Sequence, residues 1–132
     1  LVVGVIGNPQ KIPYFSIEER KWLIEQEIKE MQNIKVVTFS GLLADYVNNN
    51  GFDIVVRGLR ATMDFEYEIQ MAQMNARLYK KNVETIFLMT NPNFSFISSS
   101  MIKEVFSLNG DVSGLVPETV LNHMILRKQG VK

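Results

Sequence analysis

"VVRGLRATMDFEYE", residues 55–68, is the stretch that says most about the fold of this chain. The β-branched residues 54–56 are typical of a strand, and they run directly into the segment 57–60, Arg-Gly-Leu-Arg. A helix-like stretch of acidic and aromatic residues follows from Asp64 onward. A buried strand that ends in two arginines around a glycine indicates a place where an anion is held.

Composition limits the function classes open to the chain. Its 132 residues suit one domain, and 46% hydrophobic with 21% charged residues is the ordinary globular range. The 14 Lys and Arg equal the 14 Asp and Glu in number, which makes non-specific binding of nucleic acid or of an anionic membrane a poor prediction. Any anion that this protein binds must therefore be held by a local cluster of cations.

Cysteine and histidine usage excludes several kinds of site. The chain has no cysteine, so disulfides, thiolate metal sites and cysteine nucleophiles are excluded. Its one histidine, His123, excludes a multi-histidine metal centre and is predicted to be a surface or packing residue. The sequence has no apolar run near the roughly 20 residues that a membrane-spanning helix needs.

Strand and helix patterns alternate along the chain, which predicts an α/β class with a parallel sheet. Ser16 and Glu19 have the spacing of a capping box, so a helix is expected to start there. Gly51 and Gly110 are expected to end helices, and Pro117 suits the first turn of the last one. Strands are predicted over 1–7, 34–39, 53–57 and 83–89, and further helices over 42–49, 64–80, 99–108 and 117–127.

Polar segments follow three of the predicted strands. Lys11 comes after the first strand, residues 57–60 end the third, and residues 94–100 follow the fourth. In doubly wound folds ligands bind at the carboxyl ends of the strands, so we expect these segments to converge on one edge of the sheet.

Arg57 and Arg60 have two interpretations. Guanidinium groups match phosphate oxygens bidentately, and a glycine between them, Gly58, lets a ligand approach the backbone closely. Alternatively, the arginines form ion pairs with acidic residues of the following helix, namely Asp64, Glu66 or Glu68. Their position at a strand end favours phosphate binding.

The segment "FSFISSS", residues 94–100, ends in three serines at a predicted helix start. Free N–H groups and hydroxyls there favour anion binding, whereas the simpler interpretation is N-capping by one serine. Lys11 either reaches a phosphate or is solvated, and Glu68 either binds a ribose or faces water. Met71 and Met74 are interpreted as core or subunit-contact residues.

The segment at 55–75, together with "NPNFSFISSSMIKEV" at 91–105, closely resembles bacterial phosphopantetheine adenylyltransferases. The resemblance extends over the whole chain, through "NPQKIPYFSIEER" at 8–20 and "GDVSGLVPETV" at 110–120. It implies a single domain, 1–132, with a Rossmann-type nucleotidyltransferase fold whose parallel sheet carries helices on both faces. The implied reaction joins ATP and 4′-phosphopantetheine to give dephospho-coenzyme A and pyrophosphate. Mg2+ as cofactor, a cytoplasmic location and a homohexamer are implied as well.

The resemblance also implies residue roles. Lys11 and Arg60 would be catalytic, and Lys11, Leu43 and Arg57 would contact phosphopantetheine. No side chain is expected to ligate a metal, because Mg2+ would bridge phosphates. Phe94 replaces a tryptophan of the family and keeps an apolar wall. The residues that would contact ATP are Gly58, Leu59, Arg60, Glu68, Phe94, Ser95, Phe96, Ile97, Ser98, Ser99 and Ser100.

One departure from the family concerns the start of the chain, where Leu1 already lies in an apolar run. The family begins with a further strand, a Gly-x-Phe-Asp-Pro turn and a Gly-His motif whose histidine stabilises the transition state. We therefore expect about 30 more residues, a strand plus a helix, in the natural protein. The 132 residues alone are expected to be inactive and exposed along one sheet edge.

Three alternative functions stay open at this point. The nearest is another adenylyl- or cytidylyltransferase of the same fold, acting on a different phosphate. A non-catalytic nucleotide-binding paralogue is the second. A flavodoxin-like signalling domain is the third, but it would need acidic residues at the strand ends where this sequence has basic ones. The sequence has neither a G-x-x-x-x-G-K-[ST] nor a G-x-G-x-x-G segment, so a nucleotide would be held by other means.

Overall fold

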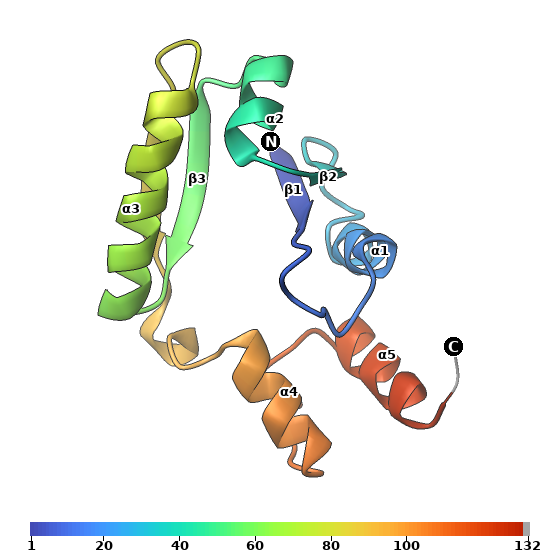
Figure 1. Cartoon of the computed structure of the whole chain (residues 1–132). Helices are drawn as coiled ribbons and strands as arrows, with labels where there is room; N and C mark the ends of the chain where they lie inside the picture. The colour runs from blue at the N-terminus through green and yellow to red at the C-terminus, as the bar shows by residue number, and fades with distance from the viewer. Residues whose placement is uncertain (131–132) are drawn as a thin grey trace. The chain divides into compact units, whose positions relative to one another are not determined.

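The computed structural model describes residues 1–130, and of residues 62 and 63 it describes the backbone. The chain forms two compact units (Figure 1). Unit 1 comprises Leu1–Ser40 and Ile97–Lys132, and unit 2 comprises Gly41–Phe96. Each unit is described by itself below.

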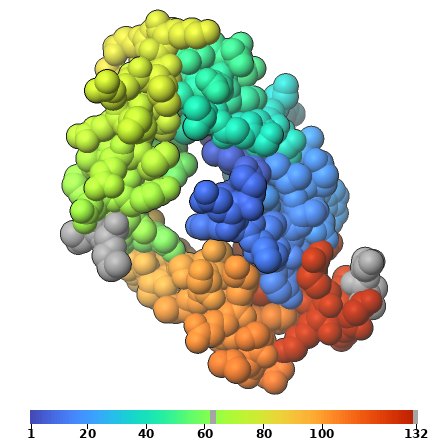
Figure 2. Space-filling model, in the orientation of Figure 1, coloured from blue at the N-terminus to red at the C-terminus, as the bar shows by residue number. Residues whose placement is uncertain are grey.

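Unit 1 is built on a pair of parallel strands, β1 (Val2–Gly7) and β2 (Lys35–Ser40). Helix α1 (Ile17–Glu27) connects these strands and packs against both of them. Helices α4 (Ser99–Ser107) and α5 (Glu118–Lys128) complete the unit. The surface of α5, in red, lies next to that of α1, in blue (Figure 2).

The start of α1 confirms the predicted capping box. The Ser16 hydroxyl accepts a hydrogen bond from the Glu19 N–H at 3.1 Å, and the Ser16 N–H donates to the Glu19 carboxylate at 2.7 Å. Arg127 of α5 forms an ion pair with the same carboxylate. The hydrogen bond from the Ser16 backbone, followed by the contact with Arg127, lowers the pKa of Glu19. One carboxylate thus caps α1 and ties it to α5.

One buried cluster of unit 1 contains Ile102 of α4, Met124 of α5 and Val112 from the segment between these helices. At the carboxyl end of α4, Asn109 rather than Gly110 adopts the left-handed conformation, with φ of 66°. Gly110 is required for a different reason, because a Cβ there would lie 2.4 Å from the side chain of Val105.

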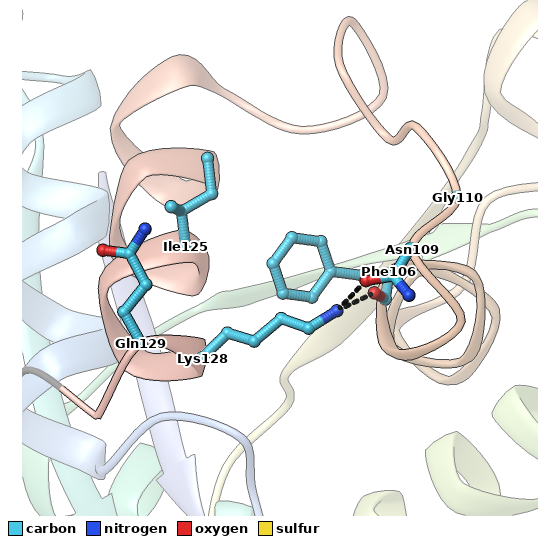
Figure 3. A pocket seen from close by; sticks show the side chains of 6 residues that line it. All are labelled: Phe106, Asn109, Gly110, Ile125, Lys128 and Gln129. Atoms are coloured by element: carbon cyan, nitrogen blue, oxygen red, sulfur yellow. Dashed lines mark hydrogen bonds between the residues drawn. The ribbon is translucent and has the colours of Figure 1, made fainter.

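Lys128 of α5 stabilises that end of α4 (Figure 3). Its ammonium donates to the Phe106 carbonyl at 3.1 Å and to the Asn109 side-chain oxygen at 2.7 Å. These residues border a small cavity of about 270 Å³ that Ile125 and Gln129 also line. A cation at a helix carboxyl terminus is favourable because the last carbonyls carry partial negative charge.

Unit 2 contains the second parallel pair, β3 (Ile54–Leu59) and β4 (Glu84–Met89). Helix α3 (Thr62–Leu78) runs alongside β3 (Figure 1) and also contacts α2 (Leu43–Asn50). A short 3₁₀ helix, η1 (Pro92–Phe94), follows β4.

Gly51 and Asn48 fix the ends of the two helices of unit 2. Gly51 ends α2 in the left-handed conformation, with φ of 70°, as the sequence predicts. The Asn48 side chain donates to the Leu78 carbonyl at 3.0 Å and accepts from the Lys80 N–H at 2.9 Å. The carboxyl end of α3 is thereby bound to α2.

The α/β class with parallel strand pairing is confirmed, with three differences in detail. The described strands form two two-stranded sheets, β1–β2 and β3–β4, one in each unit. β3 extends to Leu59, because Gly58 and Leu59 pair with Leu88 and Met89 of β4. Pro117 is the N-cap of α5 rather than a residue of its first turn.

Side-chain positions decide two further predictions. Met71 and Met74 are 40% and 56% exposed, so their placement in the core is wrong and the subunit-contact alternative stays a prediction. His123 is confirmed as a packing residue, because its ring lies 4.9 Å from that of Trp22. Within residues 1–130, the helices are too short or too polar to cross a lipid bilayer.

Candidate functional site

A cavity of about 440 Å³ in unit 1 combines cationic and apolar walls. Its charged lining consists of Lys11, Arg20 and Lys103, and neither aspartate nor glutamate is among the lining residues that the structure describes. Asn8 and Ser99 add neutral polar groups. Its apolar lining consists of Ile12, Pro13, Tyr14, Phe15, Ile97, Ile102, Val116, Val120 and Met124.

The loop after β1 positions Lys11. The Asn8 side chain accepts from the Gln10 N–H at 2.9 Å, and the Asn8 carbonyl accepts from the Lys11 N–H at 3.3 Å. Asparagine supports such tight turns because its side chain replaces a backbone acceptor. Among residues 1–130, the Lys11 ammonium has neither a hydrogen-bond nor an ion-pair partner, so it is available to an anion in the cavity.

The start of α4 forms another part of the cavity wall. The Ser98 hydroxyl accepts from the Met101 N–H at 3.1 Å, which confirms N-capping by one serine. Ser99 lines the cavity one residue further on. The N–H groups of Ser99 and Ser100 stand in the first turn, where a helix offers its own amides no acceptor. Capping by Ser98 therefore leaves the two following amides for a ligand.

Arg20 and Lys103 are cavity residues that the sequence analysis missed. Arg20 lies on α1, and one of its terminal nitrogens donates to the Ile6 carbonyl at 3.4 Å, while its Nε is buried without a partner in the described part of the chain. Lys103 follows Ser99 by four residues, which puts both on one helix face. That spacing could have revealed Lys103, whereas Arg20 reaches the cavity through tertiary packing.

In unit 2, Arg57 and Glu68 form a bidentate pair. Nε and Nη2 of Arg57 each donate to one carboxylate oxygen of Glu68 at 2.7 Å. This hydrogen bonding is the chief cause that raises the pKa of Arg57. The Glu68 side chain is 14% exposed, so the alternative in which it faces water is wrong. The ion-pair alternative for Arg57 is confirmed.

Arg60 forms the corresponding pair with Asp64 at the start of α3. The guanidinium donates to the two carboxylate oxygens at 2.8 and 3.2 Å, and the Arg60 backbone N–H donates to one of them at 3.1 Å. The hydrogen bond from the guanidinium lowers the pKa of Asp64 and raises that of Arg60. Both arginines of the segment 57–60 thus carry a carboxylate partner.

The backbone around Gly58 is open. A Cβ at Gly58 would meet none of the described atoms within 4 Å, so packing inside unit 2 does not require a glycine there. This openness fits a residue that leaves room for an external ligand. Leu59 is 3% exposed, and its side chain therefore belongs to the core of unit 2.

The other predicted site residues lie in separate segments. Leu43 is the first residue of α2 and is half-buried. Phe94 and Phe96 are 50% and 55% exposed. Between them, the Ser95 hydroxyl donates to the Pro92 carbonyl at 3.0 Å, which braces the loop after η1.

The structure thus gives two groups of predicted site residues. Unit 1 brings Lys11, Ile97 and Ser99 to one cavity. Unit 2 holds Arg57 and Arg60 in ion pairs where β3 turns into α3. The convergence of both groups on one edge, and the contact of each residue with a substrate, stay predictions. Within residues 1–130, histidine, aspartate and glutamate side chains form no group of three or more that could hold a metal ion.

Comparison with known proteins gives consistent matches. The sequence profile of the Cytidylyltransferase-like family matches residues 1–105. The phosphopantetheine adenylyltransferase of Alkaliphilus metalliredigens is 52% identical over 124 residues, which are 94% of this chain and 78% of that protein. The enzyme of the same name from Heliobacterium modesticaldum is 48% identical, over 94% of this chain and 73% of its own length. That of Clostridium tetani is 46% identical, over 92% and 75%.

Proposed function

The chain belongs to the phosphopantetheine adenylyltransferase family, within the Cytidylyltransferase-like proteins, and we propose that it transfers the adenylyl group of ATP to 4′-phosphopantetheine. The products are dephospho-coenzyme A and pyrophosphate. The chain is accordingly a nucleotidyltransferase of coenzyme A biosynthesis. One structural observation supports this reaction above others: both reactants carry several negative charges, and the described residues that line the cavity of unit 1 include three cations and no carboxylate.

The reaction is a direct displacement. A phosphate oxygen of phosphopantetheine attacks the α-phosphorus of ATP, a new P–O bond forms, and the bond to the pyrophosphate oxygen breaks. A covalent enzyme intermediate is not needed, so the protein contributes orientation and neutralisation of the developing charge. Lys11 lines the cavity, and among residues 1–130 its ammonium has neither a hydrogen-bond nor an ion-pair partner, so it would hold the nucleophilic phosphate.

Arg57 would bind the same phosphate while it keeps its carboxylate partner. Its Nε and Nη2 are engaged by Glu68, and its Nη1 stays available to a phosphate oxygen. The Arg57 side chain is 40% exposed, which leaves it accessible. Glu68 thus fixes the plane of the guanidinium, which is the kind of orientation that phosphate recognition needs.

The leaving phosphates would be held by Arg60 and by the amides at the start of α4. Helix N-termini favour anions because their free N–H groups carry partial positive charge. Mg2+ would be carried by the phosphates, to which it supplies further charge neutralisation. The family resemblance also supports a homohexamer and a cytoplasmic location, and the exposed Met71 and Met74 on α3 suit a subunit contact.

A product assay tests the proposed function. The protein with its complete natural sequence is incubated with ATP, Mg2+ and either 4′-phosphopantetheine or nicotinamide mononucleotide, and the products are identified by mass spectrometry. We expect dephospho-coenzyme A with the first acceptor and no dinucleotide with the second. A dinucleotide product, or pyrophosphate release without dephospho-coenzyme A, would contradict the proposed substrate.

The variant Arg60→Ala tests the assignment of the leaving group. It removes charge-assisted hydrogen bonds to phosphate, so we expect a strong loss of ATP turnover with the fold intact by circular dichroism. Unchanged steady-state kinetics would refute that role of Arg60.

A further inference from the structure

We infer that Arg127 of α5 is a positioning residue for the loop that carries Lys11, residues 8–15, called the Lys11 loop below. Arg127 is not among the described residues that line the unit 1 cavity, so it acts through the residues that it contacts and not on a substrate. The inference rests on the proposed function for the role of Lys11 in binding phosphopantetheine. The contacts that carry it are independent of the reaction.

The first half of the Lys11 loop has little packing of its own. Asn8 closes a turn by accepting hydrogen bonds from the backbone of Gln10 and Lys11. Residues 8–13 are nevertheless exposed, and Ile12 is 97% exposed. A loop with few buried contacts opens easily, so its order depends on the residues that anchor its ends.

Tyr14 and Phe15 anchor the second half of the loop. Their rings meet edge to face, with centroids 4.9 Å apart and an angle of 81° between the ring planes. Both side chains pack against the buried cluster that contains Met124, and both line the cavity. The position of these two rings therefore decides where the Lys11 loop meets the cavity.

Arg127 holds both rings from α5. Its guanidinium carbon lies 5.7 Å from the ring centroid of Tyr14 and 5.3 Å from that of Phe15. At such distances a guanidinium is attracted to the negative face of an aromatic ring. The Tyr14 hydroxyl adds a contact with the same helix, because it donates to the Met124 carbonyl at 3.5 Å.

The same guanidinium also holds the helix that follows the loop. Arg127 forms an ion pair with the Glu19 carboxylate, which accepts a hydrogen bond from the Ser16 N–H at the start of α1. One side chain of α5 thus contacts two residues at the end of the Lys11 loop and one in the first turn of α1. Arg127 thereby restricts the conformations of the loop before a ligand binds, which is preorganisation.

Lys128, the next residue of α5, provides a matched comparison. Its ammonium lies 5.0 Å from the ring centroid of Phe106 and donates to two oxygens at the carboxyl end of α4. Arg127 and Lys128 therefore make similar contacts, Arg127 with the Lys11 loop and Lys128 with α4. A general role of α5 in folding predicts similar effects of the two side chains, whereas positioning of the loop predicts effects of Arg127 alone.

The test compares Arg127→Gln with Lys128→Gln in the protein with its complete natural sequence. Both substitutions remove a charge and keep an unbranched polar side chain. The first readout is the rate at which trypsin cuts between Lys11 and Ile12 without substrate, followed by mass spectrometry, because this cut requires the loop to open. We expect Arg127→Gln to be cut about fivefold faster than the wild type, the loss of two exposed cation–π contacts, and Lys128→Gln at the wild-type rate.

Steady-state kinetics give the second readout. The KM for phosphopantetheine should rise by about the same fivefold in Arg127→Gln, because a ligand binds only the fraction of molecules whose loop is ordered. Its kcat and its KM for ATP should stay at the wild-type values, since the loop is ordered once phosphopantetheine is bound. Lys128→Gln should leave all three constants unchanged.

Two kinds of result would overturn the inference. Equal changes in the two variants would mean that α5 acts only through the fold of unit 1. An unchanged cleavage rate in Arg127→Gln, or faster cleavage with an unchanged KM for phosphopantetheine, would mean that Arg127 does not position the Lys11 loop for binding.

Failure of the proposed function is distinguishable from failure of this inference. If the wild type makes no dephospho-coenzyme A, while Arg127→Gln alone is cut faster at Lys11, the contact with the loop stands and the substrate assignment falls. If the wild type makes dephospho-coenzyme A and Arg127→Gln matches it in cleavage rate and in KM, the substrate assignment stands and the role of Arg127 falls.

Discussion

The two units differ in whether their cationic side chains have carboxylate partners. In unit 1, Lys11 and Lys103 line a cavity whose described lining residues include no carboxylate. In unit 2, Arg57 and Arg60 each hold a carboxylate, from Glu68 and Asp64. Unit 1 therefore presents uncompensated positive charge to a ligand, while unit 2 presents guanidinium groups whose orientation is already fixed.

This difference separates two contributions to phosphate binding. An unpaired ammonium attracts an anion strongly but has little directional preference. When a carboxylate binds one edge of a guanidinium, the net charge of the pair is close to zero. The carboxylate also fixes the plane in which the other edge of the guanidinium can donate to a ligand. We expect substitution of the unpaired lysine Lys11 of the unit 1 cavity to change ligand affinity alone, and substitution of the paired arginines of unit 2 to change both affinity and stability.

Arg57→Ala should have the largest effect. It removes the proposed phosphate contact and leaves the largely buried Glu68 carboxylate without its partner. Loss of the charge-assisted contact that Nη1 would make, worth about 1.5–3 kcal/mol, predicts a fall in kcat/KM for phosphopantetheine of about 10- to 100-fold. Destabilisation of about 1–3 kcal/mol is expected from the unpaired carboxylate, measured by urea unfolding.

The double variant Arg57→Ala/Glu68→Ala is the matched control. It removes the unpaired carboxylate, so most of the stability should return while kcat/KM stays low. Recovery of both stability and activity in the double variant would mean that Arg57 acts only through folding.

Lys11→Met should have the next largest effect, and it should be confined to binding. The Lys11 ammonium has no partner in the described part of the chain, so its removal costs no internal contact. We expect pyrophosphate affinity to fall by about tenfold at constant unfolding free energy, measured by calorimetry and urea unfolding. A loss of stability comparable to that of Arg57→Ala would erase the difference between the units.

Lys128→Met should have a smaller effect, on stability alone. It removes the cation that donates to Phe106 and Asn109 at the carboxyl end of α4 (Figure 3). A loss of about 1 kcal/mol in unfolding free energy is expected, because the contact is exposed. A greater loss of pyrophosphate affinity than that of Lys11→Met would show that the position of α4, more than the cavity charge, controls binding.

The Asp64 pair should give the smallest effect, and one that depends on pH. The hydrogen bond from Arg60 holds the pKa of Asp64 below its ordinary value of 3.8, so ionised Asp64 stabilises the fold at neutral pH. That stabilisation is lost as pH falls through the lowered pKa. The melting temperature of Asp64→Asn should therefore lie below that of the wild type at pH 7, and the two should converge once the pH falls below the lowered pKa of Asp64. An unchanged difference at both pH values would contradict this.

Local signals in the sequence predicted the element ends well. Ser16 and Glu19 bind each other within one turn, so their capping box forms as the spacing predicts. Gly51 likewise ends its helix because few other residues tolerate the left-handed conformation. The end of β3 was predicted two residues early, because pairing with β4 extends the strand through Gly58 and Leu59.

The site was harder to predict, because its partners come from different elements. From the sequence, Arg57 could bind either a phosphate or an acidic side chain. Its pairing with Glu68 depends on how α3 packs beside β3. Arg20 reaches the cavity from α1, which local spacing cannot reveal. Lys103 could have been found from its four-residue spacing to Ser99, had the helix face been traced beyond the three serines.

The most direct test of the account is an experimental structure of the chain with pyrophosphate bound. We expect phosphate oxygens in the unit 1 cavity, within hydrogen-bonding distance of the Lys11 ammonium and of the Ser99 and Ser100 N–H groups. Pyrophosphate bound elsewhere, with this cavity free of it at saturating concentration, would contradict the claim that uncompensated positive charge makes the cavity a phosphate site.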